Sequence, residues 1–222
     1  KCVFNQREVG NDTHAFHDAL RNAMRQAPDC ILIGEIRDQE TMRMALTYAL
    51  SGHLCLATLH ANNSYQAMNR VISFFPLEVR PMLLQDLAVS LKAIVSQRLV
   101  RTVDGKRTPA VEVLLNTRNV QEAIEKGAVG EVKEMMEKSM SPGSQTFEQD
   151  LFRLVRQGRI STDDALANAD SATNLGLLLG NSGIMPAMAE RVKNPAPGLG
   201  KGPGGPSFSE FKISEDSPEP GY

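Results

Sequence analysis

Two short apolar runs, each followed by polar residues, constrain the fold of this 222-residue chain most strongly. The first run, 30–33, is followed by Glu35 and Arg37, and the second, 54–57, is followed by His60. An unbroken apolar run is typical of a strand in a parallel sheet that is covered by helices on both faces. The segment between the runs decides how these two predicted strands are connected.

That segment has the pattern of a helix. Asp38 suits its N-cap, Ser51-Gly52 suits its end, and apolar residues recur between them at helical spacing. A strand, a crossover helix and a second strand form a right-handed unit in which the strands are parallel. Both strands then end at one edge of the sheet, where open α/β sheets bind ligands. The sequence therefore predicts that Glu35 and His60 converge at this edge.

The rest of the chain predicts an α/β core followed by helices. Asp104-Gly105 separates two β-rich segments, which predicts an antiparallel hairpin appended to the parallel sheet. A strand is predicted over 1–8. Helices are predicted to start near 12, 62 and 78, and the last of these runs to 95. Four further helices are predicted over 120–126, 131–140, 147–157 and 162–167. We predict a core over 1–116, a helical region over 117–179, and a flexible Pro/Gly-rich tail over 180–222.

Composition narrows the class of function. The formal net charge of -2 gives no basic footprint for nucleic acid, so we predict no nucleic-acid partner. The three cysteines lack metal-ligand spacing, which predicts no metal bound by them and favours a reduced, cytoplasmic compartment. No apolar run is long enough to span a membrane.

Several motifs in order resemble the ATPases of type IV pili and bacterial secretion systems. Ile-Leu-Ile-Gly-Glu-Ile-Arg-Asp at 31–38 is similar to the Walker B box of these ATPases, and Thr-Leu-His-Ala-Asn-Asn at 58–63 to their His box. Residues 5–10, 145–147, 158–161 and 165–166 extend the resemblance over much of the chain. Within the GspE/VirB-type superfamily, these motifs resemble the twitching-motility and retraction motors of the PilT/PilU family. Residues 119–126 depart from the PilT-type Ala-Ile-Arg-Asn-Leu-Ile-Arg-Glu motif, which favours the PilU-like branch.

The resemblance implies a RecA-like P-loop NTPase fold with a site that binds and hydrolyses ATP. It implies that Glu35 is the catalytic residue, which orients or deprotonates the attacking water. It also implies that His60 contacts the γ-phosphate and that His53, Thr58 and Arg37 belong to the ATP-binding set. From its place near a strand start, His53 is explained as well by a structural hydrogen bond.

Two arginines and a magnesium ion complete the implied site. Arg7 and Arg70 are implied to contact phosphate or a neighbouring subunit, although an ion-paired or solvent-exposed arginine explains each of them too. Gly34 stands where the Walker B pattern has an aspartate, so the implied Mg²⁺ is held mainly by other groups. The sequence contains no G-x-x-x-x-G-K-[ST] phosphate loop. We therefore expect the C-terminal part of an ATPase, inactive by itself.

The resemblance also implies partners. They are other copies of the same chain in a homo-hexamer, a PilT-like motor and the inner-membrane pilus platform protein, met in the cytoplasm at the pilus base. Two alternatives stay open: an assembly or secretion ATPase of the same superfamily, and a non-catalytic adaptor of a PilT-like motor. A third, a nucleic-acid motor, is disfavoured by the net charge.

Overall fold

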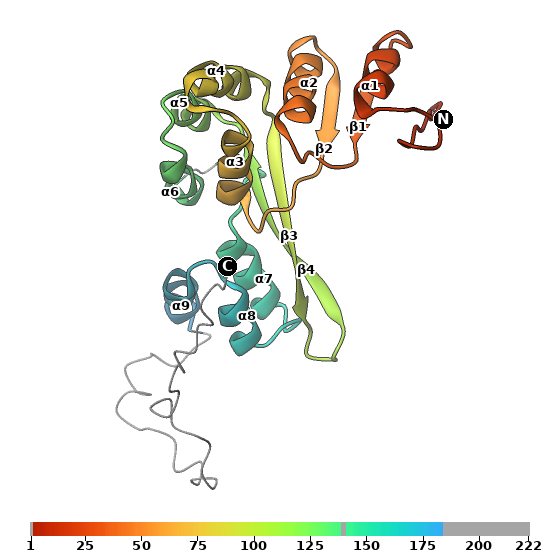
Figure 1. Ribbon diagram of the computed structural model, residues 1–222. Helices are drawn as coiled ribbons and strands as arrows, with labels where there is room; N and C mark the ends of the chain where they lie inside the picture. Colours follow the sequence, from red (N-terminus) through yellow and green to blue (C-terminus); the bar gives the residue numbers. More distant parts are fainter. Residues whose placement is uncertain (1, 139–140, 184–222) are drawn as a thin grey trace, which may run out of the picture.

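A computed structural model describes residues 2–138 and 141–183. Figure 1 shows a larger part built from α1 to α6 with β1 and β2, a smaller part built from α7 to α9, and the long hairpin β3–β4 reaching from one to the other. The elements of the larger part and the hairpin are α1 (Phe16–Met24), β1 (Cys30–Ile33), α2 (Gln39–Leu50), β2 (Leu54–Ala57), α3 (Ser64–Ser73), α4 (Arg80–Ser90), β3 (Ala93–Arg101), β4 (Arg107–Leu115), α5 (Arg118–Glu125) and α6 (Val132–Lys138). Single 3₁₀ turns precede α4 and α6, and the smaller part consists of α7 (Phe147–Arg156), α8 (Thr162–Asn168) and α9 (Ala172–Asn181).

The predicted strand, helix and strand are confirmed. β1 and β2 pair in parallel, with Cys30 opposite Leu54 and Ile33 opposite Ala57. Asp38 is the N-cap of α2, and its side chain accepts a hydrogen bond of 2.8 Å from the Thr41 amide. This bond satisfies one of the amides that the first turn of a helix leaves without a partner.

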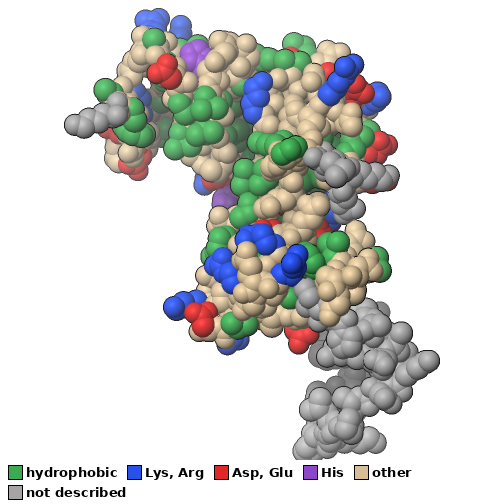
Figure 2. Space-filling model, turned by 180° about the vertical axis from the view of Figure 1, so that it is seen from behind, with side chains coloured by type: hydrophobic (Ala, Val, Ile, Leu, Met, Phe, Trp, Pro, Cys, Tyr) green, Lys and Arg blue, Asp and Glu red, His purple; other side chains and the backbone are tan. Residues whose placement is uncertain are grey.

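Only one face of the β1–β2 pair is covered within the described residues. Ile31 and Ile33 are buried in a cluster that includes side chains of α2, whereas Leu32 is 70% exposed on the opposite face. Leu54 and Leu56 of β2 are exposed as well, and Figure 2 shows hydrophobic side chains gathered on this part of the rear face. The prediction that both faces are covered is therefore wrong for these residues, because only α2 and its neighbours pack on the pair.

The predicted hairpin is confirmed, and it forms a sheet of its own. β3 and β4 pair antiparallel from Ala93 opposite Leu115 to Arg101 opposite Arg107. Gly105 adopts a φ of 80° in the connecting turn, which glycine tolerates better than other residues. The predicted helix from 78 to 95 is wrong beyond Ser90, where α4 ends, since the residues after it pair with β4 instead.

The hydrophobic side chains form two clusters. One contains residues from α1 to α6 with β1 and the near ends of the hairpin, and the other contains the far ends of the hairpin with α7, α8 and α9. Packing thus groups α5 and α6 with the larger part, while the predicted boundary after residue 116 stays a prediction.

Three further predictions have different outcomes. The strand predicted over 1–8 is wrong for residues 2–8, where Val3 and Phe4 are exposed and no partner strand is present among the described residues. The helix α9 was not predicted. The predicted tail lies outside the described residues from 184 onward. None of the helices in the described ranges combines the length and apolarity that crossing a membrane requires.

Candidate functional site

Glu35 and His60 meet where β1 and β2 end. Glu35 follows β1 by two residues and His60 follows β2 by three, and the Oε1 atom of Glu35 lies 2.9 Å from Nε2 of His60. The parallel register places the carboxyl ends of both strands at the same edge, as the sequence predicted. An acid and an imidazole are therefore in hydrogen-bond contact at the rim of the sheet.

Two hydrogen bonds hold the two strand-end loops together beyond the last ladder pair. The Ile36 amide donates to the Thr58 carbonyl at 3.0 Å, and the Thr58 hydroxyl donates to the Gly34 carbonyl. The structure thus brings Thr58 to the same edge as Glu35, where it supports the loop that carries the acid.

Arg37 holds the other oxygen of the Glu35 carboxylate. Its Nε and Nη2 atoms lie 2.6 and 2.5 Å from Oε2 of Glu35. This hydrogen bond is the main cause that lowers the pKa of Glu35 below its ordinary value; desolvation opposes it, and the charges of Arg37, His60 and Arg70 add to it. Glu35 is therefore ionised at neutral pH.

Replacing Arg37 with glutamine should raise the pKa of the Glu35 carboxyl toward its ordinary value, because the group that favours the ionised form is lost. We expect the midpoint of Glu35 protonation, followed by NMR of its side-chain carboxyl, to move to higher pH in Arg37→Gln. Arg43→Gln, a change of an exposed arginine on α2, is the control and should leave the midpoint in place. An unchanged midpoint in Arg37→Gln would show that Arg37 does not set the charge of this acid.

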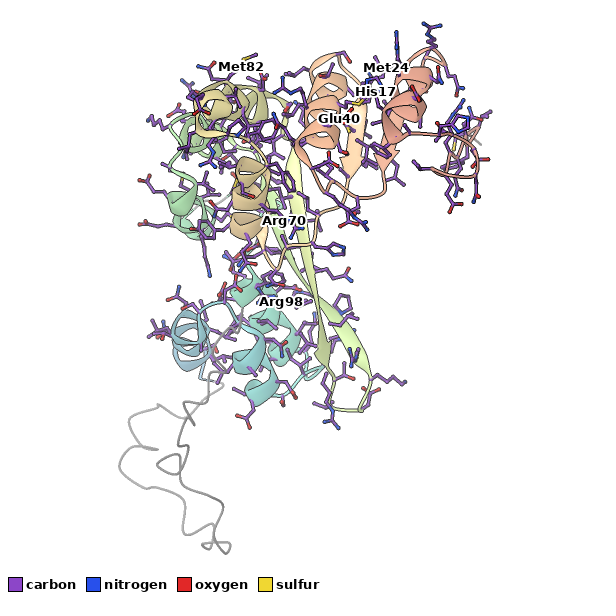
Figure 3. The ribbon with its side chains drawn as sticks, in the orientation of Figure 1. His17, Met24, Glu40, Arg70, Met82 and Arg98 are labelled. Carbon is purple, nitrogen blue, oxygen red and sulfur yellow. The ribbon has the colours of Figure 1, made fainter. Side chains whose placement is uncertain are left out.

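The structure brings Arg70, one of the two predicted arginines, into contact with a residue of the site. Arg70 on α3 donates from Nη1 to the carbonyl of His60 at 3.1 Å, and Figure 3 shows it beside the loop that follows β2. Arg7 is exposed in the segment before α1. Its predicted contact with phosphate or a neighbouring subunit stays a prediction.

His53 lies at the opposite end of β2 from His60. It precedes the first residue of the strand, and its Nδ1 atom is 2.9 Å from the Ser51 hydroxyl. Its ring lies edge-on to Tyr48, with the ring centres 6.5 Å apart. His53 was expected to belong to the ATP-binding set with Glu35 and His60, and a place for it at their edge of the sheet is wrong in position, because His53 sits where the chain enters β2. An ATP-binding role for His53 stays a prediction that this geometry does not favour.

Several charged residues near the site were not singled out from the sequence. Glu112 on β4 is 2% exposed and accepts a hydrogen bond of 2.7 Å from the Ser64 amide at the start of α3. The sequence does contain a signal for the burial of Glu112, because Glu112 alternates in phase with Ala110 and Leu114, which are both buried. Arg98 and Asp170 form an ion pair that joins β3 to the turn before α9, and no local pattern marks this pair.

The residues at this edge do not by themselves suit a magnesium site. Glu35 is the carboxylate there, and its two oxygens face the cationic or polar nitrogens of Arg37 and His60. Within residues 2–138 and 141–183, no three His, Cys, Asp or Glu side chains are grouped to hold a metal ion. A hard cation needs several oxygen ligands, so most of the ligands for Mg²⁺ must be other groups.

A parallel strand pair with a crossover helix, and an acid and an imidazole at its carboxyl edge, form an α/β site of the kind at which open sheets bind ligands. Comparison with family models gives the family: residues 4–132 match the model described as Type II/IV secretion system protein. The chain belongs to this family.

Comparison with individual proteins leads to the same family. The chain is 53% identical over 179 residues to the Type IV pilus ATPase PilU of Pseudomonas aeruginosa, covering 80% of this chain and 47% of that protein. It is 39% identical to the Type IV pilus retraction ATPase PilT of the same species, covering 78% of this chain and 51% of PilT. The chain thus spans about half the length of the relatives it matches.

Solved structures confirm the fold class. The crystal structure of the pilus retraction motor PilT with bound ADP matches 75% of this chain and 47% of its own, at a TM-score of 0.68 and 38% identity. The ATPase DotB of Legionella pneumophila matches 71% of this chain and 43% of its own, with a TM-score of 0.63 and 32% identity. The RecA-like ATPase fold expected from the resemblance is therefore shown for the part of the chain that these matches cover.

Proposed function

We propose that this chain is part of an ATP-hydrolysing motor subunit of the type IV pilus machinery, similar to PilU, that supports pilus retraction and twitching motility. The observation that carries the proposal is the contact of Glu35 with His60 at the shared edge of two parallel strands. The family model matches residues 4–132, which include this edge, and the activity of the relatives named as pilus ATPases is proposed for the chain on that basis.

Glu35 is the catalytic residue in this proposal. A carboxylate beside a γ-phosphate orients the attacking water, and positioning of this kind supplies most of the catalysis in phosphoryl transfer. Oε2 of Glu35 is held by Arg37, whereas Oε1 has one contact, with Nε2 of His60, and keeps a lone pair with which Glu35 can hold a water.

His60 and Arg37 supply the positive or hydrogen-bonding groups that meet the γ-phosphate in this proposal. Thr58 fixes the loop through the Gly34 carbonyl, and Arg70 fixes the His60 backbone. The phosphate loop and most ligands of Mg²⁺ come from residues outside these 222, since the sequence holds no such loop. The uncovered face of β1 and β2, with Leu32, supports the proposal that further residues pack there in the full-length protein.

The assembly is a homo-hexamer in the cytoplasm at the pilus base, bound to the inner-membrane platform protein and working with a PilT-like motor. What supports it is the family and the similarity to PilU and PilT. A head-to-tail ring places one subunit's arginines near its neighbour's nucleotide, which is the role we propose for Arg7.

Two measurements on one variant distinguish a motor subunit from a non-catalytic adaptor. Glu35→Gln in the full-length protein should lower ATP turnover by orders of magnitude. A motor then loses its contribution to twitching motility in cells, whereas a non-catalytic adaptor of a PilT-like partner keeps it. Retained motility together with lost turnover would replace the motor proposal by the adaptor.

A further inference from the structure

A polar seam lies between the two hydrophobic clusters, beside the loop that carries His60. Arg98 on β3 and Asp170 in the turn between α8 and α9 are paired there, and their side chains are only 20% and 15% exposed. Figure 3 shows Arg98 where the hairpin passes from the larger part of the molecule to α7. The pair joins residues that are 72 positions apart in the sequence.

The Arg98 guanidinium contacts three separate segments. It donates to the Asn168 carbonyl at the end of α8 at 2.7 Å, and to the Asn62 carbonyl in the loop after β2 at 3.2 Å. Its central carbon lies 4.0 Å from the centre of the Phe147 ring at the start of α7, which is a cation–π contact. One side chain thus ties the loop that follows His60 to both α7 and α8.

Asp170 reaches the same loop from the other side. Its Oδ2 atom accepts a hydrogen bond of 2.9 Å from the side-chain amide of Asn63, three residues after His60. The carbonyl oxygen of that amide caps α3 by accepting from the Gln66 amide at 2.9 Å. Asn63 therefore fixes the start of α3 and the turn before α9 at the same time.

Lys133 and Glu148 extend the seam. The Lys133 ammonium lies 3.8 Å from Asp170 and 3.2 Å from Glu148, and Glu148 accepts from the Ser171 amide at 2.8 Å. Two carboxylates and two cations thus alternate along the seam, and the turn that carries Asp170 is held from both sides.

We propose that Arg98 and Asp170 form a latch whose function is to position His60 relative to Glu35, and that the helical region α7–α9 acts on the site through this latch. The inference rests on the proposed function, since it gives His60 a place beside the γ-phosphate. Arg98 and Asp170 are positioning residues: they hold the Asn62 carbonyl and the Asn63 amide, not the reacting atoms.

Stability alone does not account for this arrangement. The helical region is already held on the hairpin by fully buried side chains such as Phe147, Leu151 and Leu154. A partly buried ion pair adds little net stability, because the loss of hydration offsets much of the attraction. Its fixed geometry does restrict the backbone next to His60, and a displacement of about 1 Å in a catalytic group costs on the order of 100-fold in rate.

The test is ATP turnover by Asp170→Asn in the full-length protein. This change turns one oxygen into an NH₂ group that faces the donors of Arg98 or Asn63, while the size of the side chain is kept. We expect kcat to fall about 10- to 100-fold and KM to change less than about threefold, because the nucleotide still binds but His60 is misplaced. Asp163→Asn, an exposed acid on α8, is the matched control and should leave both constants unchanged.

A combined variant shows whether the effect passes through His60. If the latch acts by positioning this ring, Asp170→Asn changes turnover little once His60→Ala is present. If the two losses multiply, or if Asp170→Asn alone leaves kcat unchanged, the latch is overturned. Arg98→Lys, which keeps the charge and loses the forked geometry, is the second variant if Asp170→Asn does not fold, and the same outcomes decide.

The same set of variants distinguishes failure of the latch from failure of the proposed function. Unchanged turnover in His60→Ala and Glu35→Gln would remove the proposed site itself, and the latch with it. Reduced turnover in both, together with unchanged turnover in Asp170→Asn and Arg98→Lys, would remove the latch alone.

Discussion

Glu35→Gln should lower the turnover of ATP by about 100- to 10,000-fold, which is the range that loss of a positioned acid–base group produces. Glutamine keeps the size of the side chain and an oxygen that can accept from Arg37, so the two loops should stay in place. The amide has no negative charge and does not accept a proton from water, so the attacking water is no longer oriented or activated. Binding of ATP should change little, since Glu35 meets the water and not the base or ribose.

Steady-state hydrolysis and nucleotide binding by the full-length protein measure these two quantities. Glu40→Gln, a change of an exposed acid in the first turn of α2, is the matched control and should retain turnover within about twofold. Figure 3 shows Glu40 on α2. Normal turnover in Glu35→Gln would remove the catalytic assignment, and an equal loss in Glu40→Gln would show that the effect is not specific to the site.

Phe147→Ala should destabilise the packing of α7, α8 and α9 by about 3–5 kcal/mol, the usual cost of truncating a buried phenylalanine to alanine. Phe147 is fully buried in the cluster that these helices form with the far ends of β3 and β4. The variant loses the apolar contacts of the ring and also the platform on which Arg98 lies. The loss should therefore spread from α7 to the seam beside His60.

Native-state hydrogen exchange at the amides of α7 and α9 measures this loss as a lower free energy of opening. Phe152→Ala on the same helix is the control, because Phe152 is only partly buried, and its effect should be less than about half as large. If the two variants lowered the opening free energy equally, Phe147 would not be the centre of this cluster.

The unit around the site was predictable because its signals are local. The apolar run, the N-cap at Asp38 and the glycine after the helix determine strand, helix and strand, and the handedness rule then places both strand ends at one edge. The position of Glu35 beside His60 follows from these rules. His53 precedes the second strand, so the same rules place it at the opposite end of that strand from His60.

The errors arose where tertiary pairing decides between two possible structures. Leu91 and Ile94 continue the apolar stripe of α4, but Ile94 pairs with Leu114 in β3–β4 instead. The exposed Leu32 face was predicted to be covered because the pattern of a strand does not tell which residues cover it.

The polar seam could not be predicted from the sequence, because its contacts join residues that are far apart in the chain. Asn63 and Asp170 are 107 residues apart, and nothing local to either one indicates the other. Glu112, which lies outside the seam, could have been found from the sequence, because a charged residue in the inward phase of a strand indicates a buried partner.

The central claim is that Glu35 and His60 share a rim where a triphosphate lies. A structure of the full-length protein with a non-hydrolysable ATP analogue tests it most directly through the distances from the γ-phosphate to these two side chains. The account predicts His60 within about 2.6–3.2 Å of a γ-phosphate oxygen, or one water away, with Glu35 one water from the phosphorus. A γ-phosphate bound at another edge of the sheet, with Glu35 still paired to Arg37, would contradict it.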